Sequence, residues 1–493
     1  MHRSRYVLFF ALTVFGQTRQ PLLDRDGHVK EDAYIPAPLP ESARAYADIS
    51  GAQMKTLVEE VVAISLKSRD DGNRYWGRIA GTKYETMTGD LMEAKFRKLG
   101  LTNIQRPEFA LPPQWVPTDW DLTATAKGKT LKFSSLLPAL GSAATPAGGI
   151  EMEPVWVGLG TSGDFAGREV RGKAVIIHAM LAPGEMGQSA NMEGAFARAI
   201  SLGAGAVIGV WGYYDNMAVW QGYRNGAINT QMASMGPIPA FWLGFEDGKK
   251  LRDLVAEGGA KVRMRVQAEM AAGRKSESVY ATLPGRAGAD ENILVMAHMD
   301  GYFEAALDNA SGLAAVLALA EHFSKVPQDQ RMRNIIFIGT AGHHVGSPNA
   351  RYLRDRKDLL DKTALMINAE HIAVSQTLNW QTTLRRSTVV WPRRWWVNGS
   401  RKLTDLTLDA YRTLGVGVIG DMDPSATGEM GAIARLAPSI QLIRSPESKH
   451  TDADIRAFVP AVGLEAVGRA FAMIIDGVNK LDRKDLLPER SSP

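Results

Sequence analysis

The side chains best suited to chemistry gather between residues 292 and 371. Three short apolar runs in this stretch are each followed by residues that could bind a metal ion or move a proton. The runs are Ile293–Ala297, Ile335–Gly339 and Ala364–Ala369. The residues that follow them are His298, the pair His343 and His344, and Glu370. Asp308 lies between the first two runs and just ahead of a predicted helix.

These groups need elements that bring them together. Gly312–Phe323 has apolar residues at helical spacing, and Ser311 stands where it could cap the helix N-terminus. An order of strand, helix, strand, helix, strand predicts an α/β fold: a mostly parallel twisted sheet with helices on both faces. Ligands bind such sheets beyond the carboxyl ends of the strands, so we expect the candidate residues to meet there.

The residue types suit a centre of one or two zinc ions. Each ion takes about four or five ligands, drawn from imidazole, carboxylate and water, and a further acid orients each histidine. Asp300, two residues after His298, could be such an acid. His450, in the late polar segment Lys449–Asp452, offers another imidazole. Five of the nine histidines fall among these carboxylates: 298, 343, 344, 371 and 450.

The order of these motifs resembles the zinc exopeptidases of the bacterial leucyl aminopeptidase and glutamate carboxypeptidase type. The matching segments are Ala297–Asp300, Leu307–Gly312, Asn368–Glu370 and Lys449–Asp452. The resemblance covers about residues 50–125 and 275–480. It implies that His298, Asp308 and Glu370 hold one zinc ion and that Asp308 and His450 hold the other. It also implies that Asp300 is the acid behind His298.

One part of the family pattern is absent, namely two adjacent glutamates that act as general base and as ligand of the second zinc ion. An alignment without a gap puts Thr340 and Ala341 in these positions, and a turn two residues shorter puts His343 and His344 there. The leading interpretation is that the two histidines replace the pair, one ligating, with His343 the added ligand, and one accepting protons. Alternatively Glu304 or Glu447 supplies the base, or the protein is a single-metal or non-catalytic relative that acts as a binding or scaffold protein.

The pattern of residues 151–272 predicts a separate, smaller β/α domain. Five short apolar strand candidates occur there, with two predicted helices, Asn191–Leu202 and Glu246–Ala256. The segment resembles the protease-associated domain in Glu169–Lys173, Ala199–Val210 and Pro237–Ala240. In that family the domain is non-catalytic and is inserted in a peptidase domain or lies beside it.

The remaining boundaries follow from composition. Residues 1–20 have a basic start and an apolar run too short to span a bilayer, which predicts a signal peptide and a periplasmic or secreted protein. The other predicted parts are an N-terminal arm (21–50), a first part of the catalytic domain (51–150), the main catalytic domain (273–480) and a tail (481–493). The chain has no cysteine, which excludes disulfides, thiolate ligands and a cysteine nucleophile.

The sequence therefore predicts an exported zinc-dependent exopeptidase, aminopeptidase- or carboxypeptidase-like. It would hydrolyse peptide or related amide bonds with metal-bound hydroxide. Its expected partner is a peptide or small amide substrate, with no membrane span. Trp391–Trp396 interleaves basic and aromatic residues that could stack on bases, but a net charge of +4 on an exported chain of 493 residues argues against nucleic acid.

Overall fold

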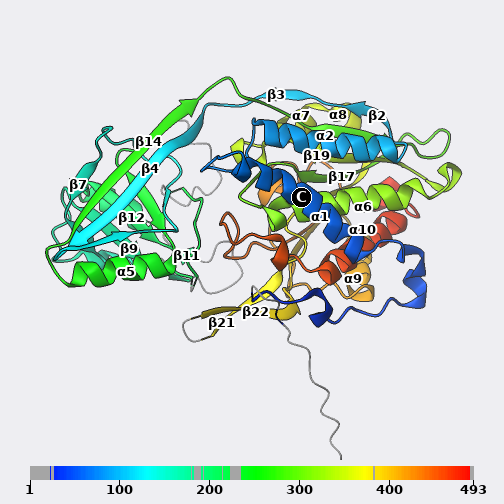
Figure 1. The fold of residues 1–493 in the computed structure, drawn as a ribbon. Helices are drawn as coiled ribbons and strands as arrows, with labels where there is room; N and C mark the ends of the chain where they lie inside the picture. The colour runs from blue at the N-terminus through cyan, green and yellow to red at the C-terminus, as the bar shows by residue number, and fades with distance from the viewer. Residues whose placement is uncertain are drawn as a thin grey trace, which may run out of the picture.

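The computed structural model describes residue 23 and residues 27–488, apart from 179, 182–189, 192–193, 214, 223–234 and 381–382. The predicted signal peptide lies outside these residues. Within them, no helix combines the length and the apolar character needed to cross a membrane. A larger part built on a seven-stranded sheet lies beside a smaller part built on two further sheets (Figure 1).

The seven-stranded sheet confirms the predicted α/β fold. Its strands, in spatial order, are β2 (Thr102–Gln105), β16 (Val279–Leu283), β19 (Asn334–Thr340), β17 (Asn292–His298), β20 (Thr363–Ala369), β24 (Ser439–Ile443) and β23 (Arg394–Asn398). The central strands β19, β17, β20 and β24 are parallel, whereas β2, β16 and β23 pair antiparallel at the two sides. The three predicted apolar runs are thus the three adjacent strands at the centre of the sheet.

These runs are continuously apolar because helices cover both faces of the sheet. Along β17, Val295 packs in the same core as α1 and α6, whereas Leu294 and Met296 pack in the core that includes α7. The helices of the first face are α1 (Gly51–Asp70), α2 (Lys83–Lys98), α6 (Gly312–Ser324), α9 (Arg401–Thr413) and α10 (Ala461–Val478). Those of the second face are α7 (Pro348–Asp355) and α8 (Lys357–Leu360).

Helix α6 is capped by a different residue from the one predicted. Ser311 has helical backbone angles, and its hydroxyl donates to the carbonyl of Leu307 at 2.8 Å instead of capping. The Asn309 side-chain oxygen accepts from the N–H of Gly312 at 3.1 Å, and its amide donates to the carbonyl of Ala369 at 2.9 Å. The prediction for Ser311 was therefore wrong. Asn309 satisfies the orphan donor and also ties the start of α6 to the end of β20.

The smaller part contains all five predicted strands. Its sheets have the orders β6-β13-β12-β9-β8 and β5-β4-β14-β7. Their bounds are β4 (Gln114–Ala126), β5 (Lys129–Lys132), β6 (Leu137–Pro138), β7 (Ile150–Met152), β8 (Pro154–Trp156), β9 (Ala174–His178), β12 (Ala206–Val210), β13 (Ala240–Leu243) and β14 (Lys261–Ala271). Helix α5 (Phe245–Ala256) matches its prediction. Helix α4 (Ala195–Ser201) begins later than the predicted Asn191, which lies in the short strand β11 (Ala190–Asn191).

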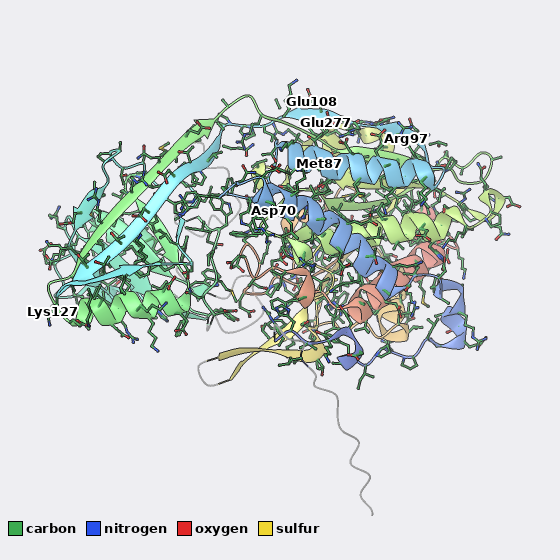
Figure 2. The ribbon with its side chains drawn as sticks, in the orientation of Figure 1. Asp70, Met87, Arg97, Glu108, Lys127 and Glu277 are labelled. Atoms are coloured by element: carbon green, nitrogen blue, oxygen red, sulfur yellow. The ribbon has the colours of Figure 1, made fainter. Side chains whose placement is uncertain are left out.

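Sheet pairing extends the smaller part beyond its predicted start at residue 151. The long strand β4 pairs with β14 from Gln114 to Thr125, so these sheets begin near residue 114. The chain crosses between the two parts twice, and the crossings run together as the antiparallel pair β3 (Glu108–Ala110) and β15 (Lys275–Glu277). Glu108 and Glu277 mark this pair in Figure 2.

Candidate metal centre

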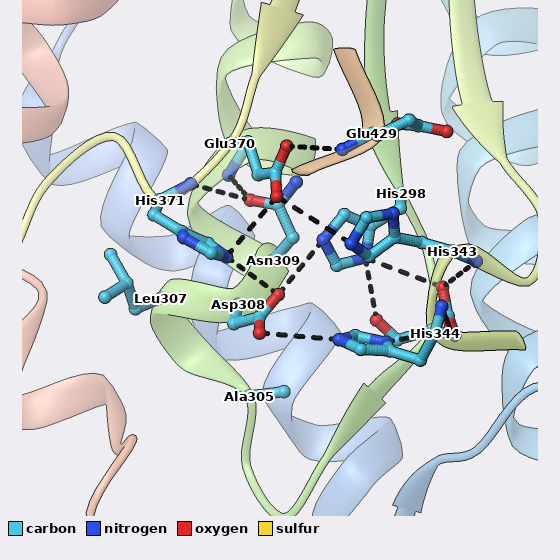
Figure 3. Close-up of polar contacts among 12 residues, drawn as sticks. His298, Ala305, Leu307, Asp308, Asn309, His343, His344, Glu370, His371 and Glu429 are labelled. Atoms are coloured by element: carbon cyan, nitrogen blue, oxygen red, sulfur yellow. Dashed lines mark hydrogen bonds and ion pairs between the residues drawn. The ribbon is translucent and has the colours of Figure 1, made fainter. Parts of the chain in front are cut away.

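The candidate residues lie together at the carboxyl ends of the four parallel strands. His298 is the last residue of β17, and Glu370 directly follows β20. His343 and His344 lie in a short helical turn after β19, and His450 lies in the loop after β24. The structure brings together every site residue that the sequence predicted, all of them buried: His298, Asp300, Asp308, His343, His344, Glu370 and His450 (Figure 3 labels five of them).

The Asp308 carboxylate lies at the centre of this cluster. Its Oδ1 atom is 3.0 Å from Nε2 of His298 and 2.9 Å from Nε2 of His371. Its Oδ2 atom is 3.0 Å from Nε2 of His450 and 3.5 Å from Nε2 of His344. Each oxygen of one buried carboxylate therefore faces its own pair of imidazole nitrogens.

This arrangement fits metal ions better than it fits hydrogen bonds. Among the described residues, Nε2 of His298, Nε2 of His371 and both carboxylate oxygens of Asp308 are buried without a hydrogen-bond partner. The Nε2 atoms of His344 and His450 face each other at 3.2 Å, which needs a proton or a cation near both. Buried polar atoms without partners are costly, and imidazole with carboxylate is a donor set that zinc prefers. The residues therefore fit one ion on each side of Asp308.

Asp300 fixes the orientation of two of the rings. Its carboxylate lies 2.9 Å from Nδ1 of His344 and accepts the backbone N–H groups of His343 (3.0 Å) and His344 (2.9 Å). For His298 the nearer partner of Nδ1 is the Asp300 carbonyl oxygen at 3.0 Å, with the carboxylate at 3.5 Å. Both rings thus donate from Nδ1 and turn the lone pair of Nε2 toward Asp308. The resemblance placed this acid behind His298, whereas its short carboxylate contact is with His344.

His371 and His450 have unusual backbone conformations. Their φ angles are 53° and 59°, in the left-handed region that residues other than glycine rarely adopt. Such strain persists only where surrounding structure imposes it, and it often marks functional sites. The carbonyl of His450 accepts the N–H of Trp220 at 2.8 Å, and Nδ1 of His371 lies 3.3 Å from the Ser445 hydroxyl.

His343 and Glu370 lie beside the imidazole pairs that flank Asp308. Nε2 of His343 is 3.8 Å from Oε1 of Glu370, and the His343 ring stacks on that of His298 with centroids 4.3 Å apart. The other carboxylate oxygen of Glu370 accepts from the side chain of Asn368 at 2.7 Å and from the N–H of Glu429 at 3.2 Å. His343, Glu370 and His298 also lie close enough to form a group that could hold an ion.

The surroundings of the cluster keep two of its candidate ligands, His450 and Asp308, in the metal-binding form. Burial, together with the nearby Lys449 ammonium, lowers the pKa of His450 to about 3, so the ring is neutral. Burial alone would raise the pKa of Asp308, but His371, Lys449 and His344 hold it well below its usual range. Lys449 lies 3.8 Å from Oδ2 of Asp308. Burial raises the pKa of two further carboxyls, those of Glu429 and Asp454, to about 7 each, which indicates crowded negative charge that a cation would relieve.

Sequence reasoning missed three residues of this site. His371 is one of the five clustered histidines, and no motif predicts a role for it, although it directly follows Glu370 at the same strand end. Asp454 accepts the backbone N–H groups of Leu307 (2.8 Å) and Asp308 (3.1 Å) and so fixes the segment that carries the central carboxylate. Glu429 lies in the short 3-10 helix Gly428–Ala432, remote in sequence from the other site residues, and no motif indicated it.

The two carboxylates suggested as alternative bases have other partners. Glu304 forms an ion pair with Arg456 at 3.0 Å, and Glu447 accepts from the hydroxyl of Thr377 at 3.0 Å. The histidine pair therefore remains the leading interpretation for the missing glutamates.

Comparison with known proteins supports the class that this geometry suggests. Residues 278–413 match the model of peptidase family M28. The matched segment runs from β16 to α9, so it contains the whole cluster except His450 and the two acids Glu429 and Asp454. A search of curated proteins gives no match.

Several solved structures share the fold over almost their whole length. A zinc aminopeptidase from Bacillus subtilis has a TM-score of 0.61 at 19% identity, covering 92% of this chain and 99% of that one. A peptidase M28 precursor from Shewanella amazonensis has a TM-score of 0.70 at 18% identity, covering 91% and 99%. An aminopeptidase from Aneurinibacillus has a TM-score of 0.55 at 18% identity, covering 90% and 96%. These likenesses show that the fold extends over both parts of the chain.

Proposed function

We propose that this protein is a zinc-dependent exopeptidase that removes residues from the amino end of peptides. The observation that carries the proposal is the placement of Asp308 between two pairs of imidazoles at the carboxyl ends of four parallel strands. The match to peptidase family M28 supports the metallopeptidase class. The structural neighbours described as aminopeptidases favour the amino end.

The chain's own residues would hold the ions and the reacting groups. Asp308 would bridge two ions, with His298 on one side and His344 and His450 on the other. When bound, zinc lowers the pKa of water toward about 7 and polarises the scissile carbonyl. Asp300 keeps His344 in the ligating tautomer through its contact with Nδ1.

His343 is the candidate proton acceptor in place of the missing glutamate. Burial lowers its pKa well below the usual range, and neighbouring His298 and His344 lower it further, so the ring is neutral. Its Nε2 atom is buried without a hydrogen-bond partner among the described residues. A neutral imidazole in this position can take a proton from water and pass it to the leaving amine.

Hydrolysis of aminoacyl p-nitroanilides and short peptides tests this function. We expect turnover that a chelator abolishes and zinc restores, and we expect none on N-acetylated peptides. Turnover of N-acetylated peptides with loss of turnover on C-amidated ones would reverse the assignment to a carboxypeptidase. No zinc-dependent turnover of either kind, with zinc bound, would favour the scaffold interpretation, which the comparisons do not favour.

We also propose that the protein is exported and that its smaller part is a protease-associated domain. The basic start and short apolar run of residues 1–20 support export. The strand order of the smaller part is compatible with an inserted non-catalytic domain. Mass spectrometry of the mature N-terminus checks export, because retention of residues 1–20 in the cell extract would contradict it.

A further inference from the structure

We propose that His371, and not Glu370, completes the ion site on the Oδ1 side of Asp308. The inference rests on the proposed function, because it assumes that the cluster binds zinc. It changes the ligand that the motif Asn368–Glu370 implies by resemblance.

Glu370 groups with other residues than the central carboxylate. Its Oε1 atom, buried without a hydrogen-bond partner among the described residues, lies with His298 and His343 and in no ligand group with Asp308. Its Oε2 atom accepts two hydrogen bonds, from Asn368 and from the N–H of Glu429. The backbone at Gly428 lies close to the same carboxylate, since a Cβ atom on this glycine would be 2.3 Å from Oε1 of Glu370. Turning this side chain toward Asp308 would break both hydrogen bonds and leave their donors buried without an acceptor.

His371 needs no such movement. Its Nε2 atom is already 2.9 Å from Oδ1 of Asp308, whereas it is 3.8 Å from Oε1 of Glu370. His371, Asp308 and His298 offer three ligand atoms that all lie within 4.8 Å of one another. Among the described residues Nε2 of His371 has no hydrogen-bond partner.

The backbone conformation and its hydrogen bonds orient the His371 ring. A φ of 53° turns the chain at His371 away from the direction of β20. The backbone N–H of His371 donates to the side-chain oxygen of Asn309 at 3.3 Å. The Ser445 hydroxyl lies 3.3 Å from Nδ1 on the far side of the ring. The Ser445 hydroxyl can accept a hydrogen bond from Nδ1, and in that tautomer Nε2 is free to bind a cation.

Zinc content of matched variants tests the assignment without relying on activity. The variants are Glu370→Gln, which keeps an acceptor for Asn368 and Glu429, and His371→Asn, which tolerates the left-handed backbone. We expect Glu370→Gln to retain as many zinc ions per chain as the natural protein after dialysis. We expect His371→Asn to lose one ion per chain and to change the visible spectrum of the cobalt-loaded protein.

Two further measurements separate the assignment from folding and from the proposed function. His322→Ala, which removes a buried histidine that contacts Asp48 at 2.7 Å outside the site, should keep all ions. Circular dichroism and thermal unfolding of each variant show whether it folds, and His371→Gln replaces His371→Asn if that variant does not. Loss of an ion from Glu370→Gln, or retention of all ions by the His371 variants, overturns the assignment while leaving zinc binding intact. A natural protein without bound zinc refutes the proposed function and this assignment together.

Discussion

At the scale of single residues, the site depends on one carboxylate whose two oxygens serve different histidine pairs. Asp308 can do this because Asp454 holds its backbone N–H, which fixes where the side chain begins. Burial lowers the pKa of His371 and His450, so these two rings are neutral and their lone pairs can donate to a cation.

Replacing Asp300 by Asn should weaken zinc binding or turnover by about 10–100-fold, the usual cost of losing an acid that orients a ligand. The amide cannot match the charge that holds Nδ1 of His344 at 2.9 Å. Competition with a chromogenic chelator measures the affinity, and steady-state kinetics measure kcat. Asp290→Asn, on an exposed acid, is the matched control. If the Asp300 variant has the same zinc affinity and kcat as this control, Asp300 does not orient the ligand.

His343 and His344 should respond differently to replacement by Ala. His344→Ala removes a nitrogen that faces Oδ2 of Asp308, so we expect one zinc ion fewer per chain. His343→Ala should keep the ions and lower kcat by about 10²–10⁴-fold, the contribution of a positioned general base. Metal analysis and kcat on the same preparations check both outcomes. If His343→Ala turns over like the natural protein, another group is the base.

At the scale of elements, the join between α6 and β20 positions both sides of the cluster. Asn309 caps α6, bonds the last residue of β20 and accepts the N–H of His371. One side chain thus couples the helix start, the strand end and a candidate ligand.

Asn309→Ala should lower the free energy of unfolding by about 1–3 kcal/mol, because it removes a cap and leaves buried backbone groups unpaired. Urea unfolding measures the change. Ser311→Ala is the comparison, since the Ser311 hydroxyl donates to the carbonyl of Leu307 at 2.8 Å and accepts the N–H of Ile372 only at 3.4 Å. We expect a smaller loss for Ser311→Ala, and the reverse order would show that Ser311 is the effective cap.

At the scale of the whole molecule, the smaller part contacts the metal centre through the loop that carries His450. The N–H of Trp220 donates to the carbonyl of His450 at 2.8 Å, and Asp452 accepts the N–H of Ala218 at 2.9 Å. The smaller part therefore supports the strained backbone of one candidate ligand, although its own residues supply none of the imidazoles.

In the metal-free protein, Glu429 and Asp454 should each contribute stability that is lost as pH rises from about 4 to about 7. Buried His450 contributes in the opposite direction, because its lowered pKa favours the folded state as pH rises. The folded-state pKa values of Glu429 and Asp454, about 7 each, lie above their ordinary values because burial disfavours the charged form. At these two carboxyls the folded protein binds more protons than the unfolded protein in this window, so their deprotonation favours unfolding. Each group contributes up to about 3–4 kcal/mol to this loss.

Thermal unfolding across this pH range, with chelator and with zinc, measures the effect. Zinc should raise the midpoint, because a ligand that binds only the folded state stabilises it by about 2.7 kcal/mol at a hundred times its Kd. Without metal, Glu429→Gln should gain stability relative to the natural protein as pH rises from about 4 to about 7, because it lacks the carboxyl whose deprotonation favours unfolding. If stability depends on pH in this variant as it does in the natural protein, Glu429 is already ionised in the folded protein.

The sequence by itself determined the central strands, helix α6 and the class of the site. Its apolar runs and helical spacing are local patterns, and the end of a buried parallel strand is a predictable place for a ligand. Only the tertiary structure decided the roles within the site. Whether His371 or Glu370 faces Asp308 depends on backbone angles and on the distant segment at Gly428 and Glu429, which no local pattern encodes. The start of the smaller part near residue 114 was likewise decided by the pairing of β4 with β14, because strand pairing joins residues far apart in the chain.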